Sequence, residues 1–228
     1  MTSQRAASIT ASSNIPGAPA SVKLVLASAS PRRLQLLERV GLAPDLLNPP
    51  DVDEIPRKRE TPRALSVRLA RAKAERAREM PLVRALGPNA FILAADTVVG
   101  LGRRILPKAM TEDEARDCLS LLSGRSHYVY SSLCLISPGN RVSSRCVETK
   151  VRFKRLSRED VDSYMACGEW RSKAGGYAIQ GRAEAFVRLI TGSYSGVMGL
   201  PLHETVQLLE GAGYPVFHSW MTAPPSGV

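Results

Sequence analysis

Two continuously apolar runs predict strands that are buried on both faces of a sheet. The first spans Val22 to Ala27, and the second, Phe91 to Val99, is the most strand-like stretch of the chain. Asp96 interrupts the second run. An ionised carboxylate is costly in such a place unless it is paired, so Asp96 must have an ionic partner, bind a metal or face a cleft at the strand end. A structural role in capping a neighbouring loop is the alternative.

Apolar positions that recur every three or four residues predict the helices. In residues 62–80 the spacing of Leu65, Leu69, Ala72 and Arg76 indicates the buried side of a long helix. The other predicted helices are 31–40, 112–122, about 159–166 and 202–210, and the other predicted strands are 127–136, 142–154 and 185–190. Residues 43–61 and 192–196 are expected to be loops because they are rich in proline, glycine and polar residues.

The helix that begins at Pro31 carries two cations, Arg32 and Arg33, in its first turn. Unpaired N–H groups and the helix dipole favour anions at that position, and other predicted helix starts in this chain carry acidic residues. A local rule that is broken at one place is expected at a functional site. Together with the hydroxyls of Ser28 and Ser30, the two guanidinium groups would bind a polyanion such as a phosphate chain. The alternative is that both arginines are only solvated.

The composition indicates a globular protein. The chain has 228 residues, of which 44% are hydrophobic, enough to bury the core of one sizeable domain or of two closely packed lobes. No apolar run is long enough for a membrane span and the first residues lack a secretory h-region, so we expect a cytoplasmic location. Residues 1–21 predict a disordered leader, and residues 212–228 predict a peripheral tail. The four cysteines are widely spaced and indicate neither a zinc site nor a disulfide framework.

The net charge of +10 attracts polyanions. A nucleic acid and a small phosphorylated substrate both suit that charge. Only 5% of the residues are aromatic, and no stretch interleaves aromatic with basic residues as single-strand binders do. Nucleic acid is therefore the less favoured partner. Within this basic chain Asp51, Asp53 and Glu54 form an acidic cluster whose carboxylates could hold a divalent cation, although a solvated loop is the simpler interpretation.

A glycine-rich segment, residues 173–181, also has the composition of a binding site. Its glycines permit close approach of the backbone to a ligand, Tyr177 offers an aromatic face, and the Gln180 amide can read the edge of a base. The chain has no P-loop, no dinucleotide fingerprint and no His-Glu-x-x-His motif. P-loop nucleotidases, dinucleotide enzymes and zincins are therefore disfavoured.

Six short motifs, taken together and in order, resemble those of the Maf family. They are Ala27 to Arg33, Arg68-Leu69-Ala70 with Lys73, Ala95-Asp96-Thr97, Leu122 to Arg125 with His127, Lys173 to Gly181, and Gly199 to Leu202. The resemblance implies an α/β fold with a central mixed sheet, flanking helices and two lobes around a cleft, related to the inosine triphosphate pyrophosphatases. On the same resemblance, residues 22–211 form the pyrophosphatase domain. The Tyr-x-Ile-Gln-Gly form of the fifth motif is similar to the branch that acts on dTTP and UTP.

The resemblance also implies roles for single residues. Asp96 matches the proton acceptor of the family, and Arg32, Thr97 and Gln180 match its specificity positions, whereas Ser28, Arg33, Glu54, Lys73 and Lys108 match other polar positions of the cleft. We accordingly expect Lys73 and Lys108 to act with Asp96 in catalysis. Glu54 and Asp96 are expected to hold a divalent cation such as Mg²⁺, Mn²⁺ or Co²⁺. Substrate binding is expected from Ser28, Arg32, Arg33, Thr97 and Gln180.

The expected function is therefore metal-dependent hydrolysis of dTTP and UTP, and of modified pyrimidine nucleotides, to a nucleoside monophosphate and pyrophosphate. The family resemblance implies a homodimer, and no membrane partner is expected. Two alternatives remain open. One is the same chemistry on modified or purine triphosphates such as 7-methyl-GTP. The other is a non-catalytic nucleic-acid or division-control module, against which the presence of Asp96, Glu54 and Lys108 argues, because a binding module needs no buried carboxylate beside its anion site.

Overall fold

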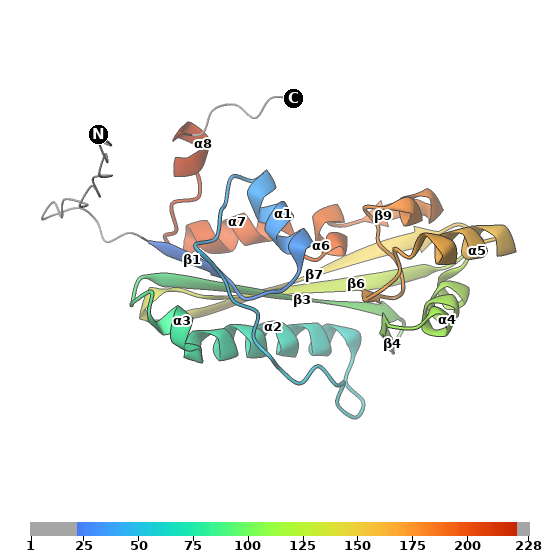
Figure 1. Cartoon of the computed structure of the whole chain (residues 1–228), viewed down its shortest axis with the longest axis horizontal. Coiled ribbons are helices and arrows are strands. Elements are labelled where there is room, and N and C mark those ends of the chain that lie inside the picture. Colours follow the sequence, from blue (N-terminus) through green and yellow to red (C-terminus); the bar gives the residue numbers. More distant parts are fainter. Residues whose placement is uncertain (1–21, 223–228) are drawn as a thin grey trace, which may run out of the picture.

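The structure is a computed structural model that describes residues 22–222 of the chain. A long mixed sheet runs through it, with α2 (Pro62–Glu79) and α3 (Pro81–Arg84) on one face and α1 (Pro31–Arg39) and α7 (Leu202–Gly211) on the other (Figure 1). The expected leader, residues 1–21, lies outside the described residues. The prediction of an α/β fold with a central mixed sheet and flanking helices is confirmed.

Within residues 22–222 the main sheet has seven strands, in the order β2-β1-β3-β6-β7-β9, with β4 paired to β3. Strand β1 pairs in parallel with β2 and β3, and the other pairs of this sheet are antiparallel. Its strands are β1 (Lys23–Leu26), β2 (Leu46–Leu47), β3 (Ala90–Leu101), β4 (Arg104–Leu106), β6 (Ser126–Ile136), β7 (Val142–Phe153) and β9 (Val187–Thr191). A separate two-stranded sheet consists of β5 (Lys108–Ala109) and β8 (Lys173–Ala174). The remaining helical segments are α4 (Glu112–Leu122), η1 (Pro138–Asn140), α5 (Arg158–Cys167), η2 (Arg182–Phe186), α6 (Tyr194–Met198) and α8 (His218–Thr222).

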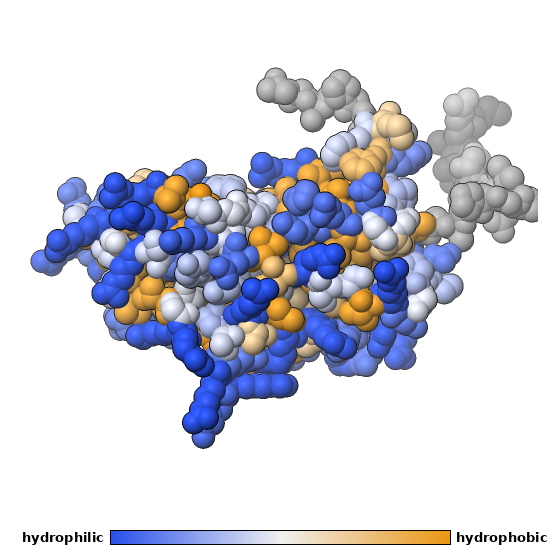
Figure 2. Space-filling view, turned by 180° about the vertical axis from the view of Figure 1, so that it is seen from behind, coloured by the Kyte–Doolittle hydropathy of each residue, from blue (hydrophilic) through white to orange (hydrophobic). Residues whose placement is uncertain are grey.

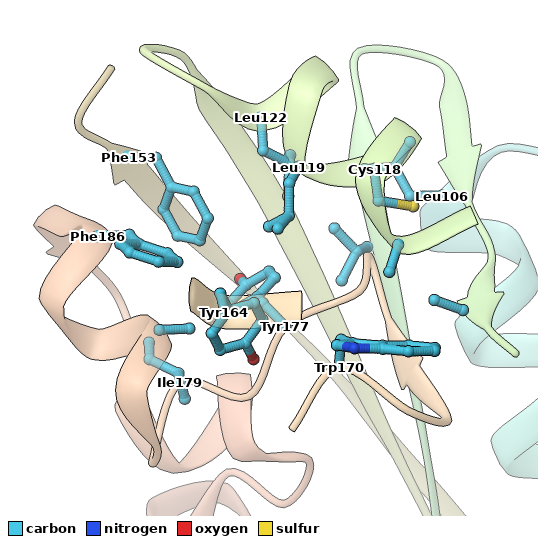
Figure 3. Close-up of a cluster of buried hydrophobic side chains, with 14 of the residues drawn as sticks. Leu106, Cys118, Leu119, Leu122, Phe153, Tyr164, Trp170, Tyr177, Ile179 and Phe186 are labelled. Atoms are coloured by element: carbon cyan, nitrogen blue, oxygen red, sulfur yellow. The ribbon is translucent and has the colours of Figure 1, made fainter. Parts of the chain in front are cut away.

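Strand β1 is buried on both faces, as its continuous apolarity predicts. Leu24 and Leu26 pack against leucines of α1 and α7 on one face, whereas Val25 and Ala27 pack against alanines of α2 on the other. A further cluster fills the end of the molecule formed by α4, α5 and residues of β6 and β7 (Figure 3). These clusters divide the protein into a sheet-centred lobe and a second lobe around α4 and α5.

Most helix starts follow the chemistry that their sequences predict. Thr111 and Ser157 form complete capping boxes at α4 and α5, and the Thr61 hydroxyl accepts a hydrogen bond from the third residue of α2. The start of α1 is different. Ser30 occupies the N-cap position, but its hydroxyl makes no capping hydrogen bond. The first turn of α1 therefore lacks the side-chain cap that α2, α4, α5 and α6 have.

Several details of the predicted pattern are wrong. The predicted loop 43–61 contains β2, and residues 185 and 186 of the predicted strand 185–190 belong to η2. The buried side of α2 runs through Leu65, Leu69 and Lys73, whereas Ala72 is partly exposed and Arg76 is exposed. The error arises because a lysine occupies the buried stripe, and its polarity hides the true helical period.

A further error concerns residues 192–196, which the sequence predicts to be a loop. Helix α6 begins at Tyr194, because the hydroxyl of Ser193 caps it by accepting a hydrogen bond from the Gly196 N–H.

The segment after α7, predicted to be peripheral from residue 212, contributes to the core as far as Val216. Tyr214 packs edge-on against Phe91, with ring centroids 5.4 Å apart, and Val216 is only 1% exposed among the leucines of α1 and α7. In α8, Trp220 donates its Nε1–H to the Val40 carbonyl oxygen over 2.7 Å. Residues 212–222 thus close one side of the sheet-centred lobe.

Part of the positive charge lies on a solvated projection. The loop before α2 extends from the molecule as a hydrophilic protrusion (Figure 2), and Arg57, Lys58 and Arg59 in this loop are all exposed. Among residues 22–222, no helix combines the length and the apolarity that crossing a bilayer requires.

Candidate active site

The centre of β3 has an open edge. Strand β1 pairs with β3 only as far as Leu26 opposite Leu93, and β4 begins to pair with β3 at Val99. Within the described chain, residues 94–98 therefore have no neighbouring strand on this side. Successive side chains of a strand point to opposite faces, so Asp96 reaches α2 on one face and Thr97 reaches α1 on the other. At an open edge both side chains can contact the same space.

A cavity of about 670 Å³ lies at this open edge. The start of α1, the open part of β3 and the glycine-rich segment line it. Arg32 and Asp96, which the sequence singled out separately, both contribute to the lining. The predicted residues that line the cavity are Arg32, Arg33, Lys73, Asp96, Thr97, Lys108 and Gln180. Ser28 and Glu54 lie behind this lining, bonded to Arg33 and to the two lysines respectively.

Arg33 binds protein atoms with its whole guanidinium group. Its Nε donates to the Gly199 carbonyl oxygen over 2.9 Å, Nη1 donates to Ser28 Oγ over 3.0 Å and Nη2 donates to Thr97 Oγ1 over 3.4 Å. Burial lowers the pKa of Arg33, an effect that the nearby Asp96 opposes. Arg33 therefore ties α1 to β3 and to the start of the α6–α7 connection.

Arg32 is different, because its Nε is buried and has no hydrogen-bond partner within residues 22–222. Burial also lowers the pKa of this guanidinium. A buried polar donor without a partner is costly and calls for an explanation. The absence of a side-chain cap on α1, together with this unpaired donor at the cavity, indicates a position suited to an anion.

A chain of charged groups crosses the side of the cavity opposite α1. Lys73 Nζ lies 2.6 Å from Asp96 Oδ1 and 2.6 Å from Glu54 Oε1, and Lys108 bonds the other oxygen of Glu54. Asp96 is 3% exposed and Lys73 is 9% exposed. The buried carboxylate thus has the ionic partner that its place in an apolar strand requires.

Glu54 is more solvated than Asp96, and its side chain is 38% exposed. Partial burial alone would raise the pKa of its carboxyl, but hydrogen bonds from Lys108 and Lys73 outweigh this effect and lower the pKa to about 2. Glu54 is therefore ionised at neutral pH and links the two lysines. The acidic loop is not merely solvated, because one of its members belongs to this charged chain.

The carboxylates beside the cavity suit a divalent cation that takes few protein ligands. Among residues 22–222, no group of three or more His, Cys, Asp or Glu side chains could form an all-protein metal site. Mg²⁺ commonly binds one or two carboxylates and completes its shell with water and substrate phosphates. Glu54 and Asp96 both lie within 2.6 Å of the same atom, Lys73 Nζ. Two converging carboxylates beside a cavity lined by arginine and lysine side chains fit such a cation.

Two cavity residues, Lys173 and Glu169, were not predicted as site residues. Burial and the nearby Arg32 lower the pKa of Lys173, which marks it as a cation in a crowded positive environment. Glu169 accepts a hydrogen bond from the Arg182 N–H over 2.8 Å. Only their place in the sequence could have indicated that these two residues belong to the site. Lys173 begins the glycine-rich segment, and Glu169 precedes it by four residues.

The sheet and the cavity together define an α/β protein in which arginine and lysine side chains surround a carboxylate at a strand edge. Enzymes that cleave phosphoanhydrides require such an arrangement of charges. The chain belongs to the Maf family, because the profile described as Maf-like protein matches residues 23–212. The family assigned from the six motifs is thereby confirmed.

Curated relatives cover nearly the same stretch. A dTTP/UTP pyrophosphatase of Mesorhizobium japonicum is 56% identical over 203 residues, which is 89% of this chain and 98% of that protein. A dTTP/UTP pyrophosphatase of Rhodopseudomonas palustris is 59% identical over 201 residues, 88% of this chain and 97% of that protein. Among solved structures, a HAM1 protein from Coxiella burnetii is 17% identical and has a TM-score of 0.49, covering 84% of this chain and 100% of that one.

Proposed function

We propose that this chain hydrolyses dTTP and UTP to the nucleoside monophosphate and pyrophosphate. The observation that carries the proposal is the shared cavity of Arg32 and Asp96, with Lys73 and Lys108 beside them. The names of relatives more than half identical over almost the whole chain support the same reaction.

The phosphate chain would lie between the start of α1 and the lysines. Arg32 has a free buried donor for a phosphate oxygen, and Lys108, whose side chain is 49% exposed, can turn from Glu54 toward a bound ligand. Guanidinium and ammonium groups stabilise the negative charge that collects on the phosphoryl oxygens and on the leaving pyrophosphate. Arg33 would act by keeping α1 in place, because its donors are already occupied.

Asp96 would accept the proton of the attacking water. The water oxygen bonds to the α-phosphorus, the bond from this phosphorus to the bridging oxygen breaks, and pyrophosphate leaves with the electron pair. The ion pair with Lys73 orients the Asp96 carboxylate at the open edge of β3. No covalent enzyme intermediate is involved in this proposal.

Glu54 and Asp96 are the residues that would hold a divalent cation, Mg²⁺, Mn²⁺ or Co²⁺, which when bound polarises the α-phosphoryl group. Lys73 bonds both carboxylates and keeps them close together. Lys73 thus preorganises the two groups.

Base selection would depend on Gln180. A glutamine amide carries one acceptor oxygen and one donor nitrogen, which complement the N3–H and the C4 carbonyl of uracil and thymine. Cytosine presents the reverse order of donor and acceptor at these positions. Thr97 lines the same cavity, but its hydroxyl lies near Arg33, Ser131 and Gly199, so we assign it a supporting role in shaping the pocket.

An initial-rate survey tests the proposal. It would use dTTP, UTP, CTP, GTP, ATP and 7-methyl-GTP, with Mg²⁺, Mn²⁺, Co²⁺ or a chelator, and would measure pyrophosphate and orthophosphate separately. We expect dTTP and UTP to be cleaved fastest, with pyrophosphate as the product and no turnover in the chelator. Faster cleavage of 7-methyl-GTP would favour the other branch of the family. Tight oligonucleotide binding without cleavage of any triphosphate would favour the nucleic-acid module.

We also propose that the protein is a homodimer, as the family resemblance implies. Sedimentation equilibrium of the full chain would give a mass near 24.7 kDa for a monomer and twice that value for a dimer.

A further inference from the structure

The glycine-rich segment carries one polar residue, Tyr177, that has no part in the proposed reaction, although it contributes to the cavity lining. Tyr177 is 5% exposed and belongs to the hydrophobic core of the second lobe. Figure 3 shows its ring beside Tyr164 in the middle of this cluster, between Phe153 and Trp170. Gln180, three residues later, lines the same cavity but is exposed. The segment thus joins a deeply buried anchor to a residue that can contact a ligand.

Among the residues that the structure describes, the Tyr177 hydroxyl has one hydrogen-bond partner, a buried histidine. It lies 2.8 Å from Nε2 of His127, the second residue of β6, which is 0% exposed. Burial lowers the pKa of His127 to about 4, so its ring is neutral at pH 7 and carries one proton. Its Nδ1 is buried and has no hydrogen-bond partner within residues 22–222. One nitrogen of the ring is therefore left unsatisfied whichever tautomer is present.

An apolar pair at these positions would avoid that cost, because replacing both partners of a buried hydrogen bond by apolar groups is often nearly neutral for stability. The rings around the pair already pack closely: Phe153 lies edge-on to His127 and to Tyr177, with centroids 5.1 and 4.9 Å apart. Packing alone does not require the two polar groups. The hydrogen bond adds a directional contact, which fixes the position and the orientation of the Tyr177 ring relative to β6.

Two further contacts fix the backbone on either side of Gln180. The Ala178 N–H donates to the Tyr164 hydroxyl over 3.0 Å, and the Arg182 N–H donates to Glu169 Oε2 over 2.8 Å. Glu169 lies so close that a Cβ on Gly181 would be 2.1 Å from its Oε2. The Gln180 amide itself has no hydrogen-bond partner among the described residues. Its neighbours are held in place while its own donor and acceptor remain available.

We propose that the Tyr177–His127 hydrogen bond positions Gln180 for selection of the base, so that Tyr177 and His127 are specificity-determining positioning residues. This inference rests on the proposed function. Neither residue needs to contact the nucleotide. They set where the amide of Gln180 stands in the cavity, and the loss of their bond lets the segment shift relative to the base.

The main test is Tyr177→Phe, which removes only the hydroxyl. We measure kcat and KM for UTP, CTP and GTP, with Tyr214→Phe as a matched control in the other lobe. In Tyr177→Phe we expect KM for UTP to rise about threefold to tenfold, as for one lost hydrogen bond, with kcat nearly unchanged and with a similar fall in the preference for UTP over CTP. Tyr214→Phe should leave these values unchanged. An unaltered UTP preference in folded Tyr177→Phe would overturn the inference.

The route of the effect is tested by adding Gln180→Ala. If Tyr177 acts through Gln180, Tyr177→Phe lowers the preference no further in a Gln180→Ala background. An equal fall in both backgrounds would contradict positioning. Should Tyr177→Phe melt at too low a temperature for assay, Tyr177→Phe with His127→Leu replaces both polar partners, and the same loss of preference is expected in a folded chain.

Binding of non-hydrolysable α,β-methylene analogues of UTP and CTP separates this inference from the proposed function. If the wild-type chain prefers the UTP analogue but cleaves no triphosphate, only the proposed hydrolysis is rejected. The effect of Tyr177→Phe on the two dissociation constants then still decides the inference. A wild-type chain without any preference between the analogues would overturn the inference directly.

Discussion

Lys73 and Asp96 form a buried ion pair across the sheet–helix interface, with Lys73 Nζ 2.6 Å from Asp96 Oδ1. The lysine comes from the middle of α2, and the aspartate comes from the part of β3 that has no strand neighbour toward β1. A buried pair stabilises little overall, because desolvation offsets much of the attraction, but removing one partner leaves an uncompensated buried charge. The pair therefore fixes the direction of the carboxylate more than it adds to stability.

The charge of Asp96 should be essential for turnover. Asp96→Asn keeps the size of the side chain but removes its ability to accept a proton, and we expect kcat for dTTP to fall about 10²- to 10⁴-fold. The chain should still fold because Lys73 keeps its contact with Glu54. The measurements are kcat and the melting temperature. Asp45→Asn is the matched control, since Asp45 pairs with Lys23 and does not line the cavity. If Asp96→Asn turned over dTTP nearly as fast as this control, Asp96 would be removed from the mechanism.

Removing the shared lysine should have a large effect on stability. In Lys73→Met, the carboxylates of Asp96 and Glu54 face each other without the cation between them, and we expect the free energy of unfolding to fall by about 3–5 kcal/mol. Lys108→Met is the comparison, because Lys108 is 49% exposed and Glu54 would keep Lys73 as a partner. Urea denaturation at pH 7 measures both. Equal losses in the two variants would contradict the central place of Lys73.

Lys73 also illustrates what the sequence could and could not predict. The strands and most helix bounds follow from apolar runs and capping residues, which are local signals. A lysine inside a helix is usually solvated, and only the family resemblance, not the helix itself, placed Lys73 in the cleft with Glu54 and Asp96, which lie 19 and 23 positions away in the sequence. That contact depends on the packing of α2 against β3. For the same reason Arg33, expected to bind substrate, is found to bond Gly199, 166 residues further on.

Glu54 gives a prediction for the dependence of stability on pH. Its pKa is about 2 in the folded protein against an ordinary value of 4.5 for a glutamate, so between these values the unfolded chain binds more protons than the folded one. Stability then increases with pH across this window. The stabilisation is fully present above about pH 4.5 and is lost as the pH falls toward 2.

The variant Glu54→Gln isolates this contribution from those of other acids. The free energy of unfolding of the wild type minus that of Glu54→Gln should be constant above about pH 5 and should shrink between about pH 4.5 and 2, as expected for a single group with a lowered pKa. Denaturant titrations at a series of pH values measure it. A difference that stays constant down to pH 2 would show that the lysines do not lower the pKa of Glu54.

Gly176 should be the more sensitive of two glycines that both have a positive φ. Gly176 and Gly139 have φ values of +69° and +77°, so an alanine at either position is strained by about 1–2 kcal/mol. A Cβ at Gly176 would also lie 3.2 Å from Ala115 Cα and 3.3 Å from Cys118 Cβ in α4, whereas a Cβ at Gly139 meets nothing within 4 Å. Overpacking of this kind costs about 1–3 kcal/mol.

Gly176→Ala should therefore lower the free energy of unfolding by about 1–3 kcal/mol more than Gly139→Ala does, because the backbone strain is common to both variants and cancels in the difference. Urea denaturation of the two variants and the wild type measures this. The difference between the two variants reports how tightly the glycine-rich segment is held against α4. Equal losses of unfolding free energy would mean that α4 yields to the added methyl group, and that the segment is less firmly anchored than its contacts indicate.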